Sequence, residues 1–129
     1  MTSQPIGLFD SGVGGLSVWR EIVRQLPNES TLYLADSAHV PYGNRGCKEV
    51  LAFSEATADF LLAKGCKAVV VACNTASAVA LRTLRRRHPG VPILGLEPAI
   101  KPAISLSETK VVGVMATPAT DRKSTRLNS

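Results

Sequence analysis

The sequence predicts a doubly wound α/β fold, in which helices cover both faces of a parallel sheet. Five short runs rich in Val, Ile and Leu alternate with helical patterns along the chain. These runs are nearly continuous rather than alternating in polarity, as expected of strands buried on both faces. The strand–helix–strand order is typical of parallel strands joined by right-handed crossovers. The chain has 129 residues, which is enough for one such domain.

Each predicted strand is a short apolar run that stops at polar or turn-forming residues. In chain order the strands are PIGLF (5–9), STLYLAD (30–36), KAVVVA (67–72), VPILGL (91–96) and KVVGVMA (110–116). The first ends at an aspartate and a glycine-rich turn, the second at an Asp-Ser pair, and the third at Cys-Asn-Thr. We therefore expect a five-stranded sheet.

Helical patterns fill the gaps between these runs, at residues 15–26, 47–64, 75–88 and about 98–106. In the second helix, mostly apolar residues recur at three- and four-residue steps, which predicts that one face of the helix points inward. The members of that face are Val50, Phe53, Thr57, Phe60 and Leu61. Trp19, on the first helix, is predicted to belong to the core.

Composition and charge exclude several classes of protein. The chain is 45% hydrophobic and 19% charged, which is a globular balance. It has no apolar run of membrane-spanning length and no export signal, so we expect a cytoplasmic domain without a membrane partner.

The net charge is +5, and much of it comes from Arg82, Arg85, Arg86 and Arg87 at the end of a predicted helix. Cations complement a helix C-terminus, so we expect a solvated helix end and no nucleic-acid partner.

The chain has three cysteines, Cys47, Cys66 and Cys73. Their number is odd, no CxxC motif occurs, and the two histidines give no metal-ligand spacing with them. This pattern supports neither a disulfide framework nor a metal site. We expect Cys47 and Cys66 to be structural.

Polar residues follow three of the predicted strands. In an open parallel sheet, ligands bind beyond the carboxyl ends of the strands, so these residues should converge on one rim. They are Asp10, Ser11 and the following glycines, then Asp36, Ser37 and the loop Pro41-Tyr42-Gly43, then Cys73, Asn74 and Thr75.

Cys73 is the sharpest candidate for chemistry, because it lies between a buried strand and a predicted helix. Thr75 is a plausible N-cap for that helix. A helix N-terminus favours the thiolate, which predicts a lowered pKa and a thiol that acts as a base or nucleophile. The alternative is a buried structural cysteine, the commonest role of a free cysteine. The sequence around Cys73 alone leaves both possibilities open, a reactive thiol and a structural cysteine.

The other rim residues are ambiguous by themselves. Asp10 needs either a hydrogen-bond donor or a role in acid/base chemistry. The glycine-rich turn after it matches no nucleotide-binding pattern, which leaves a small-anion or carboxylate site or a simple tight turn. Tyr42 is either a half-exposed loop tyrosine or part of a loop whose N–H groups hold a substrate carboxylate.

Four motifs in this order and spacing make the chain recognisable: IGLFDSGVGGLSV, PYG, VVVACNTASA and GLEPAIKPA. Together they closely resemble the N-terminal domain of the bacterial glutamate racemase family, over roughly residues 5–119. Aspartate and hydantoin racemases share the general plan. The combination of FDSGVGG with PYG resembles the glutamate branch.

The resemblance implies an enzyme that interconverts L- and D-glutamate without pyridoxal phosphate or another cofactor, and so supplies D-glutamate for peptidoglycan. The family uses two cysteines on opposite faces of glutamate, one as thiolate and one as thiol, and often forms homodimers. Cys73 matches the catalytic cysteine of the first domain, and Asp10 and Ser11 match the pair that contacts the substrate and supports this thiol. The segments that hold the substrate match Tyr42, Gly43, Asn74 and Thr75.

The chain also departs from the family pattern. Family members have two similar α/β domains, and the second cysteine lies in a Cys-Thr-His segment of the second domain. This chain has no Cys-Thr-His, and the resemblance stops after Thr120. We therefore expect an N-terminal racemase domain over 1–120, an absent second domain, and a chain that is inactive alone.

The last residues, DRKSTRLNS (121–129), resemble a translated sequencing adapter, and we expect them to be a non-native, disordered tail.

Three other functions remain open from the sequence. They are a related aspartate-type racemase, a non-catalytic module that binds a small ligand, and a flavodoxin-like nucleotide-binding domain.

Overall fold

The computed structural model describes residues 3–121 and contains a four-stranded, all-parallel sheet of order β2-β1-β3-β4. The strands are β1 (Ile6–Asp10), β2 (Thr31–Ala35), β3 (Ala68–Val71) and β4 (Ile93–Gly95). The helices are α1 (Leu16–Gln25), α2 (Cys47–Ala63), α3 (Asn74–Arg87) and α4 (Ile100–Leu106), with a short 3₁₀ turn η1 (Tyr42–Asn44). The predicted α/β class, the first four strands and all four helices are confirmed.

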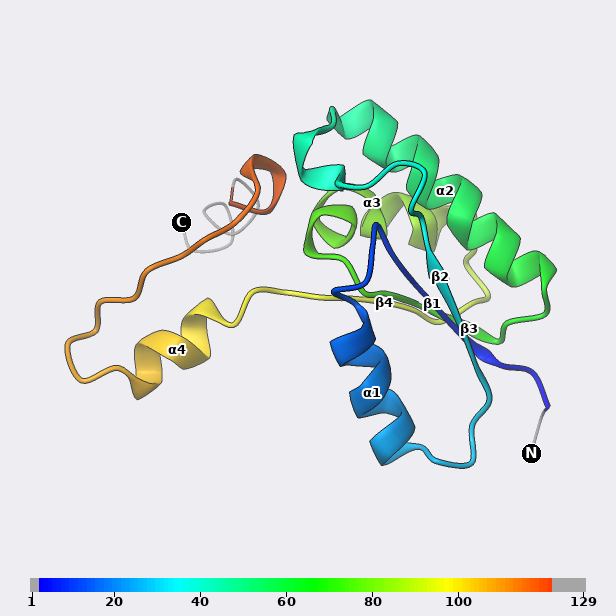
Figure 1. Ribbon diagram of the computed structural model, residues 1–129, viewed down its shortest axis with the longest axis horizontal. Coiled ribbons are helices and arrows are strands. Elements are labelled where there is room, and N and C mark those ends of the chain that lie inside the picture. Colours follow the sequence, from blue (N-terminus) through cyan, green and yellow to red (C-terminus); the bar gives the residue numbers. More distant parts are fainter. Residues whose placement is uncertain (1–2, 122–129) are drawn as a thin grey trace.

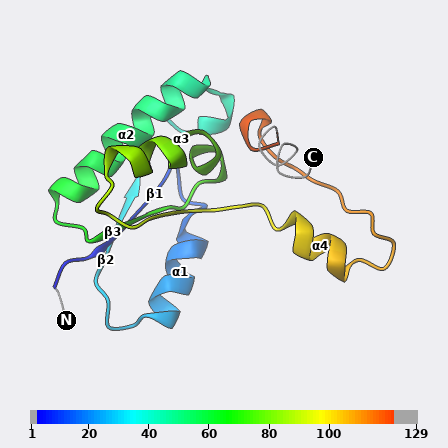
Figure 2. The ribbon, with the colours of Figure 1, turned by 180° about the vertical axis from the view of Figure 1, so that it is seen from behind.

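The helices lie on both faces of the sheet: α1 covers one face, and α2 and α3 cover the other (Figures 1 and 2). The chain moves outward from β1 to β2 and then returns across β1 to β3. Right-handed crossovers in opposite directions place their helices on opposite faces.

The core lies mainly between the sheet and α2 with α3. Its largest fully buried side chains include Phe9, Leu61, Leu84, Val69 and Val71. Helix α1, in contrast, contains no buried residue. Trp19 is only half-buried, and its Nε1 donates a hydrogen bond to Thr31 Oγ1 at 2.9 Å. The prediction of a core position is therefore only partly confirmed for Trp19.

The inward face of α2 is close to the expected one. Val50, Thr57 and Leu61 are buried and Phe53 is half-buried, but Phe60 is 47% exposed. The prediction is wrong for Phe60 because adjacent residues of a helix are 100° apart, and Leu61 takes the inward position. The Phe60 ring lies at the solvent edge, 5.3 Å from the Lys64 ammonium group.

The predicted fifth strand is wrong, since residues 110–116 form no strand in the part of the chain that the structure describes. After β4 the chain leaves the sheet, and α4 and the segment after it project from the body (Figure 1). Val111 and Met115 are fully or largely exposed there. An apolar run forms a strand only where another strand can pair with it, and this one lies away from the edge strand β4.

The end of the described chain turns back toward the sheet. A helical turn at residues 118–121 includes Asp121, whose N–H donates to the Thr117 carbonyl at 3.0 Å. The expected disorder of 121–129 is therefore wrong for Asp121, and residues 122–129 lie outside the described residues. Among the helices of residues 3–121, none has the length and apolar character needed to cross a membrane.

Candidate active site

The topology places a switch point at the carboxyl ends of β1 and β3. The chain leaves β1 toward α1 on one face and leaves β3 toward α3 on the other, so the two connections diverge. Such a switch point is where open α/β sheets bind ligands. Asp10 ends β1, Cys73 follows β3, and the Ala72 N–H donates to the Phe9 carbonyl at 2.8 Å, which holds the two strand ends side by side.

Cys73 is itself the N-cap of α3. Its backbone is extended, and its Sγ accepts a hydrogen bond from the Ala76 N–H at 3.4 Å. The prediction of Thr75 as N-cap is wrong, because Thr75 lies buried inside the first turn. The placement of a thiol at a helix N-terminus, directly after a buried strand, is confirmed.

The expected lowering of the Cys73 pKa is wrong. Burial raises the pKa of the Cys73 thiol above its ordinary value, and the negative charge of Asp10 raises it further. The N–H groups of Ala76 and Ser11 oppose this change but do not outweigh it. Loss of hydration around a buried sulfur therefore exceeds the effect of the helix N-terminus.

Replacing Asp10 by Asn is expected to lower the pKa of the Cys73 thiol, because it removes the negative charge beside the sulfur. The pKa follows from the pH dependence of alkylation by iodoacetamide, with Cys73 resolved from Cys47 and Cys66 by mass spectrometry. Asp59→Asn, on the distant part of α2, is the control and should leave the Cys73 pKa unchanged. A Cys73 pKa that stays constant or rises in Asp10→Asn contradicts this account.

Asp10 organises the glycine-rich turn. Its carboxylate accepts hydrogen bonds from the N–H groups of Ser11 and Gly15, each at 2.8 Å. Tyr33 supports the same turn, since its hydroxyl donates to the Gly12 carbonyl at 3.0 Å. The buried carboxylate has the donors that its burial requires and still lies beside the Cys73 sulfur.

Tyr42 is buried, so it is not the half-exposed loop tyrosine that the sequence allowed. Its hydroxyl donates to Asp36 Oδ2 at 2.5 Å. Burial raises the pKa of the Tyr42 phenol, and the hydrogen bond to Asp36 raises it further. Gly43 follows on the same turn, and a Cβ there would lie 2.6 Å from Thr117 Cγ2.

The start of α3 meets this turn through a chain of hydroxyl groups. Thr75 Oγ1 lies 2.9 Å from Thr117 Oγ1, which in turn lies 3.1 Å from Thr120 Oγ1. Asn74 is exposed at the N-terminal end of α3. The structure therefore brings the three predicted rim segments to one edge: Asp10 with Ser11, Tyr42 with Gly43, and Cys73 with Asn74 and Thr75.

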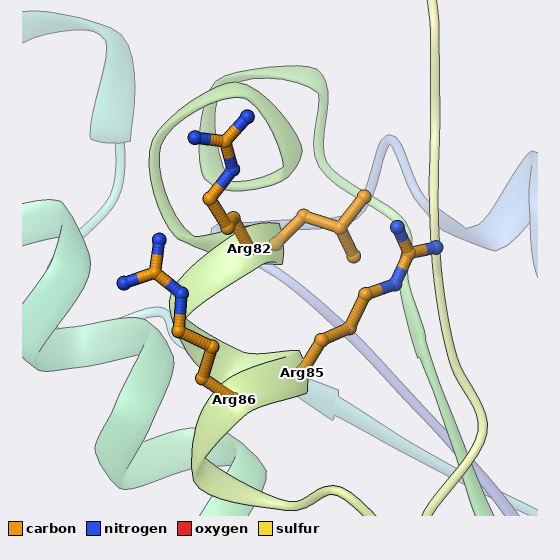
Figure 3. A pocket seen from close by; sticks show the side chains of 4 residues that line it. Arg82, Arg85 and Arg86 are labelled. Carbon is orange, nitrogen blue, oxygen red and sulfur yellow. The ribbon is translucent and has the colours of Figure 1, made fainter.

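The remaining candidates lie elsewhere. Cys66 is buried at the opposite end of the sheet, against Gly7, as expected of a structural residue, whereas Cys47 is exposed at the start of α2. The arginine cluster lies at the C-terminal end of α3, as predicted, and borders an open pocket of about 380 Å³. Figure 3 shows the three arginines that line it, Arg82, Arg85 and Arg86, with the Arg85 side chain directed away from those of Arg82 and Arg86. Within residues 3–121, no group of three or more His, Cys, Asp or Glu side chains could hold a metal ion.

Sequence reasoning gave no role to three residues that the structure connects to the site. Asp36 was visible as a polar residue at a strand end, but its bond to Tyr42 depends on the fold of the loop. Tyr33 lies inside a predicted strand, and its hydroxyl reaches the turn only because β2 pairs with β1. Thr117 follows an apolar run, and the same rule of polar residues at strand ends would have singled it out.

The fold and the site define a doubly wound α/β protein with a thiol and a carboxylate together at its switch point. A family model described as Asp/Glu/Hydantoin racemase matches residues 6–128. The chain belongs to this racemase family.

The two relatives described next are both named glutamate racemase. The chain is 57% identical over 119 residues to the glutamate racemase of Roseiflexus. This match covers 92% of this chain and 44% of the relative. The chain is 53% identical over 118 residues to the glutamate racemase of Pseudomonas aeruginosa, with the same coverage. The chain thus spans about half the length of the curated relatives it matches.

Solved structures agree in fold. Glutamate racemase from Thermus thermophilus, in complex with β-chloro-D-alanine, matches with a TM-score of 0.82 and 44% identity, over 98% of this chain and 48% of that one. The Escherichia coli enzyme, in complex with L-glutamate and the activator UDP-MurNAc-ala, matches with a TM-score of 0.86 and 38% identity. That match covers 97% of this chain and 47% of the Escherichia coli chain.

Proposed function

We propose that residues 1–120 form the first of two domains of a cofactor-independent glutamate racemase, and that Cys73 is one of its two acid/base thiols. The observation that carries the proposal is the Cys73 sulfur at the α3 N-terminus, beside Asp10 and at the switch point of the sheet. Membership of the racemase family supports it, as do relatives named glutamate racemase. The Francisella tularensis relative, described in complex with D-glutamate, supports the substrate.

The reaction needs two thiols because inversion requires proton removal from one face of Cα and delivery to the other. In one direction the Cys73 thiolate takes the α-proton, which leaves a Cys73 thiol and a substrate carbanion. A thiol from the second domain then gives its proton to the opposite face and becomes a thiolate. In the other direction the two sulfurs exchange roles, so charge and protons balance in both.

The raised pKa of Cys73 fits one half of this cycle directly. A raised pKa favours the thiol, which is the form that donates a proton. The thiolate form needs a nearby positive charge, and the ammonium group of glutamate supplies one when it binds. Asp10 holds the turn beside the sulfur and, in this proposal, takes part in controlling its protonation.

The polar groups around the switch point suit a dicarboxylate amino acid. We assign substrate binding to Asp10, Ser11, Tyr42, Gly43, Asn74 and Thr75. The Gly43 N–H, the Ser11 hydroxyl and the side chains of Asn74 and Thr75 are donors for carboxylates, and the Asp10 carboxylate is an acceptor for the ammonium group. The wider role that follows is supply of D-glutamate for peptidoglycan by a cytoplasmic homodimer.

The test begins with the genomic DNA downstream of the codon for Thr120. We expect one reading frame that continues into a second α/β domain with a Cys-Thr-His segment; its product is called here the full-length protein. That protein should racemise either enantiomer of glutamate without added cofactor, and aspartate far more slowly. Residues 1–129 alone should show no racemisation above background. A frame that stops after Ser129, or activity in the 129-residue chain, contradicts the proposal.

A further inference from the structure

Asp36 connects two parts of the site that are separate in the sequence. Its backbone N–H donates to the carbonyl of Asp10 at 2.9 Å. Its carboxylate accepts from the Tyr42 hydroxyl at 2.5 Å and lies 2.8 Å from His39 Nδ1. The Asp36 side chain is only 14% exposed. One residue therefore joins the end of β1 to the loop that contains η1.

The loop has a second support on α2. The His39 ring stacks on Phe53 with ring centroids 3.8 Å apart, and the Arg45 guanidinium lies 5.2 Å from the centre of the same ring. Arg45 Nε also donates to the His39 carbonyl at 2.8 Å. These contacts fix the two ends of the loop, whereas the Tyr42 hydroxyl fixes its middle.

The middle of the loop is the part that faces the site. Gly43 follows Tyr42 and lies against Thr117, whose hydroxyl bonds to Thr75 on the first turn of α3. The position of the Gly43 backbone relative to Cys73 therefore depends on where Tyr42 is held.

We propose that Asp36 is a positioning residue: through the Tyr42 hydroxyl it holds the Gly43 backbone where a substrate carboxylate can bind beside Cys73. This inference rests on the proposed function, since it takes Gly43 as part of the glutamate site. Asp36 itself does not contact the substrate. Asp36 holds the middle of the loop through the Tyr42 hydrogen bond and contacts His39 as well, so Tyr42→Phe isolates the first of these two contacts.

The kinetic test uses Asp36→Asn and Tyr42→Phe in the full-length protein. Each should raise the KM for glutamate by up to about tenfold and change kcat less, because Tyr42→Phe removes the hydrogen bond and Asp36→Asn replaces its charged acceptor with a neutral one. The effect of the double variant should fall short of the product of the single effects, because the two substitutions share the Asp36–Tyr42 bond, although Asp36→Asn also alters the contact with His39. Asp59→Asn, which alters a carboxylate paired with His88 away from the site, should match the wild type. An unchanged KM in Asp36→Asn and Tyr42→Phe, or additive effects in the double variant, overturns the inference.

A second test does not depend on activity. In the 129-residue chain, amide hydrogen exchange over residues 39–45 should be about tenfold faster in Asp36→Asn and in Tyr42→Phe than in Asp59→Asn. Exchange in β3 and α3 should stay unchanged, which shows that the fold is intact. If the wild-type full-length protein does not act on glutamate, the proposed function fails, and exchange alone decides the role of the Asp36–Tyr42 bond. Unchanged exchange in both variants overturns that role.

Discussion

Replacing Cys73 by Ala should reduce racemisation by the full-length protein about 10³-fold, within the range by which acid/base groups accelerate proton transfer. Alanine cannot hold or transfer a proton, so one face of Cα loses its acid/base group. The fold should remain, because the residue lost contributes one long hydrogen bond to the α3 cap and a small buried side chain. The measurement is the rate of circular dichroism change with each enantiomer as the starting material.

Cys47→Ala is the matched control for this substitution. Cys47 is also a cysteine at the start of a helix, but it is exposed and belongs to α2. Its replacement should leave the rate within about twofold of the wild type, as expected of a surface change. Racemisation that persists in Cys73→Ala, with either enantiomer, would show that the sulfur at the switch point is not an acid/base group.

Replacing Gly15 by Ala should destabilise the protein by about 1–3 kcal/mol, the usual result of forcing an extra methyl group into a packed site. The new Cβ would lie 2.7 Å from the Tyr33 hydroxyl and 2.9 Å from the Cβ atoms of Ala72 and Asp10. The last two atoms are attached to the backbone and cannot turn away. Because the Gly15 N–H also binds the Asp10 carboxylate, the turn beside Cys73 should shift and activity should fall as well.

Gly14→Ala provides the comparison one residue earlier. A Cβ at Gly14 would lie 3.5 Å from Asp10 Oδ2, an ordinary contact, and the residue is exposed. Its effect on the free energy of unfolding should stay within about 0.5 kcal/mol. Urea unfolding of the two variants gives the comparison, and equal stability of Gly15→Ala and Gly14→Ala would contradict the close packing of this turn.

Most of the fold was predictable because its strands are continuous apolar runs that end in polar residues. The same rule failed for residues 110–116, since local sequence does not say whether a partner strand is within reach. Phe60 shows a related limit: helical spacing allowed two adjacent residues on the inward face, and packing selected Leu61.

That the candidate residues lie together was predictable from the sequence, and their electrostatics less so. The ends of β1 and β3 placed Asp10 and Cys73 together, as parallel topology requires. The direction of the Cys73 pKa depended on burial and on the Asp10 charge, which the sequence cannot weigh against the helix N-terminus. The burial of Tyr42 likewise depended on its bond to Asp36, a contact made by the folded loop.

The most direct test of the two-thiol account is racemisation of L-glutamate by the full-length protein in D₂O. The account predicts that the D-glutamate formed carries solvent deuterium at Cα, because a thiol that has exchanged with solvent delivers the new hydrogen. The reaction should need no added cofactor, and Cys73→Ala should stop both the inversion and the formation of labelled product. D-Glutamate that keeps its original hydrogen, or labelled D-glutamate formed by Cys73→Ala at the wild-type rate, would contradict it.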